Sequence, residues 1–174
     1  TLVAPDDYFK TDAAQAGPAR LREYRSANPP PTLHHRGWLL WADSYQPMVL
    51  MSNEQRADVV EELLSLEQPE GGWALASLGN WERHDGEPQD RSAADGYGTA
   101  WSIYILRRAG VEPDHYAIRR GLAWLKENQR ESGRWWTRSL YKDNHHFLTH
   151  ASTAWAIMAL DSCDALTPTQ TAAK

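Results

Sequence analysis

The sequence RGLAWLKENQRESGRW occupies residues 120–135, and its second half has a counterpart in LSLEQPEGGW at residues 64–73. In both, a helical pattern ends near a glutamine, and a short turn with glycine leads to a tryptophan; the two glutamines lie 61 positions apart. A glutamine amide can bond carbonyl groups that lack partners at a helix end, glycine permits a turn with positive φ, and the tryptophan can fold back over the helix end. We therefore predict a structural staple, with no catalytic role, at four residues: Gln68, Trp73, Gln129 and Trp135.

A second pair of similar stretches alternates with the first. GTAWSIYIL at residues 98–106 matches STAWAIMAL at residues 152–160, and their tryptophans are 54 positions apart. RGWLLW at residues 36–41 is a weaker third copy. A period of about 50–60 residues is typical of stacked supersecondary units.

The two kinds of helix differ in the surface that they offer to solvent. The Thr-Ala-Trp helices are apolar nearly all round, so we expect them to be buried. The helices that end in the Gln–Trp turn are amphipathic and carry charged residues such as Glu61 and Lys126. The sequence thus predicts an all-α fold of about three stacked helical hairpins, with an inner and an outer helix layer that form part of a ring.

Three segments are expected along the chain. Residues 1–32 read as a polar N-terminal helix followed by a proline-rich linker, residues 33–166 as the repeat domain, and residues 167–174 as a frayed tail. Because the chain starts at Thr1 and no signal-like apolar stretch follows, we expect upstream sequence to be missing. An extracytoplasmic location is consistent with a leader that has been removed.

Composition excludes several classes of function. The net charge is −5 without a basic cluster, which argues against a nucleic-acid partner. A single cysteine rules out an intrachain disulfide and a Cys₄ zinc site. No run of about 20 apolar residues occurs, so no transmembrane segment is predicted, and the chain should be soluble or membrane-peripheral.

Residues 120–135 resemble the QW repeat of squalene-hopene and oxidosqualene cyclases, in which a basic, a small, an aromatic and an aliphatic residue precede Gln, Gly and Trp. Residues 68–73 are similar to the second half of that repeat, and residues 152–160 to the helix that follows it. The resemblance covers roughly residues 33–162. It implies an α/α toroid, the fold that these cyclases share with protein prenyltransferases and complement-type thioester domains, and a hydrophobic ligand of the isoprenoid type.

One motif of that family is altered. Squalene-hopene cyclases protonate their substrate with D-x-D-D-T-A, and the matching stretch here is DGYGTA at residues 95–100. Tyr97 stands where the resemblance places the proton donor. A phenol with a pKa near 10 is far too weak an acid to protonate an alkene. Cyclisation by this route is therefore not expected from this segment.

Two long loops, residues 74–96 and 136–147, each leave an outer helix and enter an inner one, so we expect them at the same end of the layer. A cavity mouth would lie there. Its aromatic residues would stabilise carbocations through their π faces, or would only pack in the core, and Asp95 would be a cavity carboxylate or a helix cap. The candidate cavity-mouth residues are Asp95, Tyr97, Trp101, Trp136, Asp143, His145 and Trp155.

The histidines and the first long loop leave further alternatives open. His146 and His150 have the i, i+4 spacing that can hold zinc, or they are hydrogen-bonded residues at a helix start. No other cofactor is expected. His34 and His35 read as surface or capping residues. The loop charges are either solvated or form a docking surface for a partner; they are Arg83, His84, Asp85, Asp90 and Arg91.

Two functions follow from the sequence. The first is a squalene-cyclase-like repeat domain, the C-terminal part of a larger protein, which binds a hydrophobic isoprenoid-type molecule without the proton-donor motif. The alternative is a non-catalytic scaffold of the same fold, which interacts with the missing upstream half or with another protein subunit.

Overall fold

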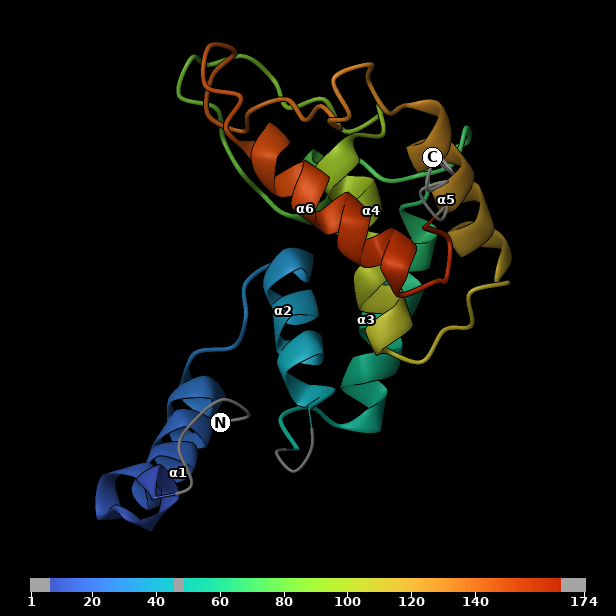
Figure 1. Cartoon of the computed structure of the whole chain (residues 1–174). Coiled ribbons are helices and arrows are strands. Elements are labelled where there is room, and N and C mark those ends of the chain that lie inside the picture. Colours follow the sequence, from blue (N-terminus) through green and yellow to red (C-terminus); the bar gives the residue numbers. More distant parts are fainter. Residues whose placement is uncertain (1–6, 46–48, 167–174) are drawn as a thin grey trace. The chain divides into compact units, whose positions relative to one another are not determined.

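The computed structural model describes residues 7–45 and 49–166, and the frayed tail expected at 167–174 lies outside them. The chain forms two compact units, Thr1–Pro31 and Thr32–Lys174, and each is described by itself. The described residues form six α-helices, two short 3-10 helices and no strand (Figure 1), so the predicted all-α class is confirmed.

The N-terminal unit holds one 3-10 turn, η1 (Tyr8–Lys10), and one long helix, α1 (Asp12–Ala27). The Thr11 side chain accepts a hydrogen bond from the backbone N–H of Ala14 and so starts α1. Pro18 lies inside the helix. The Thr11 cap fixes the start of α1 at Asp12.

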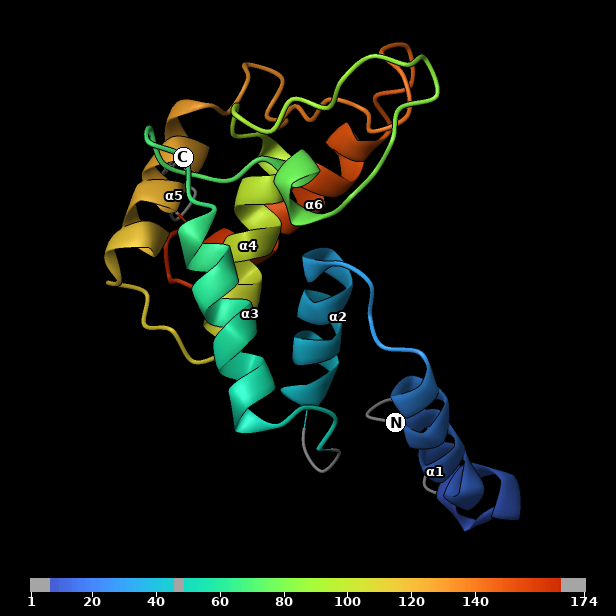
Figure 2. The ribbon, with the colours of Figure 1, turned by 180° about the vertical axis from the view of Figure 1, so that it is seen from behind.

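The second unit carries the repeats. Helices α2, α4 and α6 form one layer, and α3 and α5 form a second layer against it, as the two opposite views show (Figures 1 and 2). Helix α4 contacts α2, α3, α5 and, most extensively, α6. These helices are α2 (Leu33–Asp43), α3 (Asn53–Ser65), α4 (Gly96–Arg108), α5 (Tyr116–Glu127) and α6 (Leu148–Asp161), with a 3-10 turn η2 (Leu75–Leu78) before α4.

The central helix α4 meets the expectation for an inner helix, because ten of its thirteen residues are buried. The last helix, α6, does not. It buries one face, with Trp155 and Ala159, but Ile157 on the other face is 51% exposed. The prediction that both Thr-Ala-Trp helices are buried all round is therefore wrong for α6, because no helix among the described residues covers its second face.

The Gln–Trp turns form the same staple twice. The indole Nε1–H of Trp73 donates to the carbonyl of Leu63 at 2.7 Å, and that of Trp135 donates to the carbonyl of Leu125 at 2.6 Å. Each tryptophan thus satisfies a carbonyl near the C-terminal end of the preceding helix. Each turn also contains a glycine with positive φ, which is two residues before the tryptophan.

The register of the two staples is 62 residues, one more than the spacing of the glutamines. The backbone N–H of Gln68 donates to the carbonyl of Gly72, and the equivalent bond runs from Arg130 to Arg134. Gln68 therefore corresponds to Arg130 in space, and Gln129 occupies the preceding position. Accordingly the amide groups differ: Gln68 donates to the carbonyls of Leu66 and Arg91, and Gln129 donates to that of Gly133.

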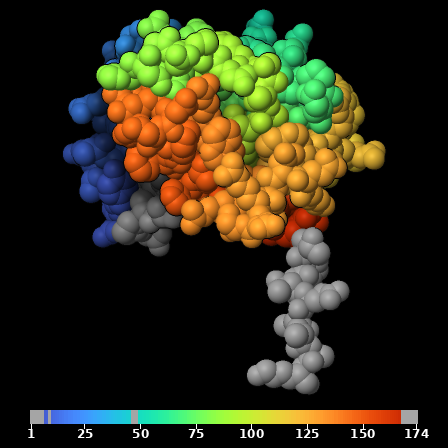
Figure 3. All heavy atoms as spheres, turned by 90° about the horizontal axis from the view of Figure 1, so that it is seen from above, coloured from blue at the N-terminus to red at the C-terminus, as the bar shows by residue number. Residues whose placement is uncertain are grey.

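The two long loops lie at the same end of this unit, as expected (Figure 1). Figure 3 looks onto this end, and the segments before α4 and before α6 lie next to each other there. They are bonded directly: the backbone N–H of His84 donates to the carbonyl of Tyr141 at 2.9 Å, and the Gln89 amide donates to the carbonyl of Leu140 at 2.9 Å.

Candidate functional site

The seven candidate cavity-mouth residues fall into three places. Asp95 and Trp136 border a small cavity between the loops. Tyr97, Trp101 and Trp155 join an aromatic cluster between α2, α4 and α6. Asp143 and His145 belong to a polar network in the loops. The structure thus does not bring the seven together into one site.

Asp95 caps helix α4 and ties the two loops to it. One carboxylate oxygen accepts the backbone N–H of Gly98 at 2.9 Å and the Thr137 hydroxyl at 2.9 Å, and the other accepts the backbone N–H of Leu75 at 2.6 Å. Burial raises the pKa of Asp95 to about 6, although these three donors favour the charged form. Its acceptor positions face protein donors, so its first role is to hold the loops.

The cavity beside Asp95 has a volume of about 80 Å³. Trp136, Arg138 and Leu140 line it from the second loop. Trp136 is 37% exposed and lies under the guanidinium group of Arg130, at 5.5 Å from the ring centroid. A cavity of this size has room for a few water molecules, so it is no binding site for an isoprenoid.

The aromatic cluster is built from one face of each inner helix. The Trp155 ring of α6 lies 5.5 Å from each of the Trp38 and Trp41 rings of α2 and from the Tyr104 ring of α4, measured between centroids. Trp101 is fully buried, and its ring fills the space that Gly37 leaves free, since a Cβ there would lie 2.3 Å from the ring. Helices α2 and α4 can therefore approach closely only because position 37 is glycine.

His34 lies at the centre of the polar contacts in this cluster. Its Nε2 atom is 3.0 Å from the Tyr97 hydroxyl and accepts the Trp38 Nε1–H at 3.3 Å. Its ring is 4.7 Å from the Trp101 ring and 5.7 Å from the Trp81 ring. The interpretation of His34 as a surface or capping residue is therefore wrong. When the weak third copy is aligned so that Trp38 matches Trp101, His34 matches Tyr97. This alignment is the one sequence signal that relates the two residues.

Neither member of the His34–Tyr97 pair is an acid of useful strength. Burial, assisted by His35, lowers the pKa of His34 to about 4, and burial raises the pKa of Tyr97 to about 12. Both groups are thus neutral near pH 7. The position where the resemblance expects a proton donor holds a hydrogen-bonded phenol.

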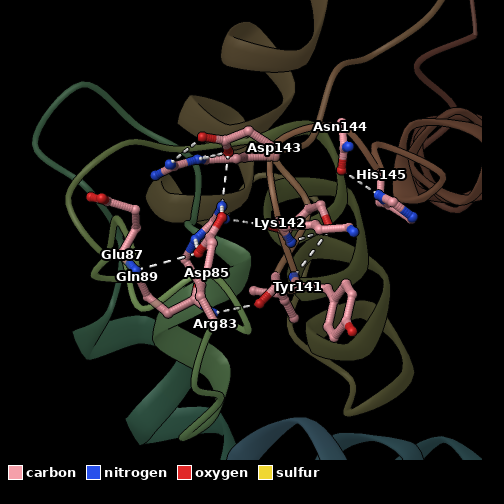
Figure 4. A network of polar contacts seen from close by, with 12 residues as sticks. Arg83, Asp85, Glu87, Gln89, Tyr141, Lys142, Asp143, Asn144 and His145 are labelled. Carbon is pink, nitrogen blue, oxygen red and sulfur yellow. Dashed lines mark hydrogen bonds and ion pairs between the residues drawn. The ribbon is translucent and has the colours of Figure 1, made fainter.

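Asp143 lies in a network around Arg83, whereas the His145 side chain bonds Asn144 (Figure 4). The Arg83 side chain is fully buried and bonds Asp85 at 2.5 Å, Asp143 at 3.0 Å and the carbonyl of Ser139 at 2.6 Å. Arg138 also bonds Asp143, and together they lower the pKa of Asp143 to about 2, with the Arg138 hydrogen bond as the largest cause. Arg83 therefore bonds across the two loops, while His84, Asp85, Asp90 and Arg91 are exposed, and a docking role for these charges stays a prediction.

The metal candidates have separate surroundings. His146 Nδ1 accepts the backbone N–H of Ser139 at 3.2 Å, and its ring lies 5.5 Å from the Trp136 ring, while His150 is exposed. Within residues 7–45 and 49–166 no group of three or more His, Cys, Asp or Glu side chains is placed to hold a metal ion. Zinc binding by His146 and His150 stays a prediction without a third ligand from this part of the chain.

No helix of the described residues is both long and apolar enough to cross a membrane.

Comparison with known proteins finds a matching family model and a curated relative. A family model described as the squalene-hopene cyclase C-terminal domain matches residues 49–145, which is more than half of the chain. A probable squalene–hopene cyclase of Sinorhizobium fredii (strain NBRC 101917 / NGR234) is 36% identical over 76 residues. These residues are 44% of this chain and 11% of that protein, so the chain spans about a tenth of the length of this relative.

Proposed function

This chain belongs to the squalene-hopene cyclase C-terminal domain family, and we propose that its aromatic cluster is the wall of a binding site for a hydrophobic, isoprenoid-type molecule. The observation that supports this is the concentration of rings on α2, α4 and α6 whose outer members stay partly open. Trp38 of α2 is 37% exposed and Tyr45, which follows α2, is 38% exposed, whereas Trp101 of α4 is fully buried. Exposed large aromatic groups on a rigid apolar base are typical of ligand surfaces.

Binding without protonation is the activity that we propose for this segment. Tyr97 replaces the proton donor that the resemblance predicts, and its hydroxyl lies 3.0 Å from a histidine that is neutral. Asp95, which keeps the first position of the motif, is committed to three protein donors. In a longer cyclase-like protein, this domain would contribute one wall of the cavity.

A titration of intrinsic tryptophan fluorescence with squalene and with geranylgeraniol tests the binding. We expect saturable quenching, and Trp38→Ala should weaken binding about tenfold because it removes a ring from the proposed wall. Trp136→Ala is the matched control, since Trp136 is also 37% exposed but lies outside the cluster. Affinity should be unchanged in this control.

Two results would count against the proposal. Absence of saturable binding of any polyprenyl compound would refute it. Formation of a cyclised product from squalene, detected by mass spectrometry, would refute the statement that this segment binds without protonating.

A second candidate function, protein assembly, is supported by the uncovered face of α6. A groove of about 300 Å³ lies there, with Ile157, Leu160 and Leu166 in its lining. Light scattering tests it: a complex or oligomer that Ile157→Asp dissolves would favour the scaffold, and a monomer at all concentrations would argue against self-assembly.

A further inference from the structure

The hydrogen bonds of His34 determine which of its nitrogens carries the proton. An indole N–H can only donate, so the bond from Trp38 Nε1 requires Nε2 of His34 to be an acceptor. The Tyr97 hydroxyl, 3.0 Å from the same atom, must then donate as well. The neutral imidazole therefore carries its hydrogen on Nδ1.

This Nδ1–H group has no acceptor among the described residues, because both hydrogen bonds of the ring are made by Nε2. Six side-chain nitrogen or oxygen atoms of the described residues are buried without a hydrogen-bond partner, and Nδ1 of the half-buried His34 is not among them. The atom is therefore accessible. It is a hydrogen-bond donor on a ring whose centroid lies 4.7 Å from that of Trp101 and 5.7 Å from that of Trp81.

The surroundings of this donor select the kind of acceptor. The ring contacts of His34 are with His35, Trp38, Trp81, Tyr97 and Trp101, and none of these carries a fixed positive charge. A diphosphate needs cationic partners, which the rings in contact with His34 do not supply. A neutral oxygen on an apolar molecule fits both the rings and the single N–H.

We propose that His34 Nδ1–H binds the oxygen atom of a terpenoid alcohol, so that the aromatic wall binds an oxygen-bearing isoprenoid more tightly than a plain hydrocarbon or a diphosphate. This inference rests on the proposed function, because it specifies the ligand of the same wall. The indole N–H of Trp38 keeps the hydrogen of His34 on Nδ1, because it can only donate, and the Tyr97 hydroxyl then donates to the same Nε2 atom.

The test compares three probes with related carbon chains on the full chain: farnesol, β-farnesene and farnesyl diphosphate, each titrated by tryptophan fluorescence. We expect farnesol to bind about fivefold more tightly than β-farnesene, as one additional neutral hydrogen bond predicts. His34→Phe should abolish this preference and leave the affinity for β-farnesene unchanged. His34→Asn, whose amide nitrogen can take the place of Nδ1, should restore it, and His35→Phe, which alters the exposed neighbour, should keep it.

The possible failures are distinguishable. Equal binding of farnesol and β-farnesene, a preference that survives His34→Phe, or tightest binding of the diphosphate would overturn this inference while the wall remains a binding site. Binding of no probe would overturn the proposed function itself. Should His34→Phe not fold, nitrogen-15 NMR of the wild-type histidines decides: farnesol should shift the His34 Nδ1 resonance and β-farnesene should not, and equal shifts would refute the inference.

Discussion

The two repeats of the second unit, residues 53–108 and residues 116–161, share a staple and differ in almost everything that surrounds it. In both, the tryptophan after the turn donates to a carbonyl ten residues earlier, at 2.7 Å and 2.6 Å. In both, a threonine of the following helix bonds the tryptophan backbone: Thr99 at 3.0 Å and Thr153 at 3.4 Å. The staple is therefore a local structure that each repeat builds for itself.

The repeats differ where neighbours are needed. Ile103 of α4 is fully buried against Gly121 of α5, whereas the equivalent Ile157 of α6 is 51% exposed. In the first repeat, the Asp95 carboxylate accepts a hydrogen bond from the backbone N–H of Leu75. In the second repeat, the hydroxyl of Thr149, at the position equivalent to Asp95, accepts the backbone N–H of Thr137. The signature therefore encodes the helix end, while burial and charge at the same positions depend on the next repeat.

The largest expected effects come from the staples. Trp73→Ala and Trp135→Ala should each lower the free energy of unfolding by about 3–5 kcal/mol, because each removes a buried indole and frees a carbonyl group. Trp73→Ala should have the larger effect, since Trp73 also packs toward Gly121 of α5. Urea denaturation followed by circular dichroism measures both.

Phenylalanine variants separate the two contributions. Trp73→Phe and Trp135→Phe keep most of the ring and should lose similar amounts, about 1–3 kcal/mol, because the same hydrogen bond is removed from each. Clearly unequal losses in this pair would contradict the equivalence of the staples.

Substitution of the equivalent residues Ile103 and Ile157 should change the free energy of unfolding by different amounts. Ile103→Ala should lower the free energy of unfolding by about 2–4 kcal/mol, because it leaves a cavity between α4 and α5. Ile157→Ala should change it by less than about 1 kcal/mol, because half of that side chain is already in water. Equal destabilisation would mean that a further segment covers α6.

The equivalent residues Asp95 and Thr149 should differ in how their contributions to the free energy of unfolding depend on pH. The pKa of Asp95 rises from an unfolded value of 3.8 to about 6 in the folded state, so the folded chain holds this proton more tightly than the unfolded chain. Its contribution to stability is therefore fully present below about pH 4 and is lost as the pH rises through about 6. The loss approaches about 3 kcal/mol for a shift of this size.

Measuring the free energy of unfolding between pH 4 and pH 7 for wild type, Asp95→Asn and Thr149→Val checks this. The difference between wild type and Asp95→Asn should shrink as the pH rises. The difference for Thr149→Val should stay constant, because no proton is involved. A constant difference for Asp95→Asn would show that its carboxyl group is ionised throughout.

The smallest effects are expected at the glutamines. Gln129→Ala should cost less than about 1 kcal/mol, because it removes one exposed bond to the carbonyl of Gly133. Gln68→Ala should cost somewhat more, since Gln68 also bonds the carbonyl of Arg91 in the long loop. Urea denaturation followed by circular dichroism ranks the two variants by their loss in free energy of unfolding. A larger loss for Gln129→Ala than for Gln68→Ala would contradict the 62-residue register of the staples.

Much of the fold could be predicted from the sequence. Helix ends depend on nearby residues: Ser52 and Gln55 form a capping box at the start of α3, and the glycine turns end α3 and α5. The candidate site was less accessible. Trp101 and Trp155 were identified as aromatic residues of inner helices, but His34 was missed, because its partner Tyr97 is 63 residues away and no local pattern connects them.

Local sequence signals specify the helical class, the two staples and the family, because caps, turns and amphipathic periods act over a few residues and are repeated along the chain. The remaining features depend on how the helices pack. The tertiary structure showed that the staple register is 62, that α6 has an open face, and that the seven candidate residues divide among three places. It also placed His34 against Tyr97. The physical reason is that packing between helices fixes which side chains meet, and a one-residue difference in a turn or a glycine such as Gly37 changes those meetings without changing any local pattern.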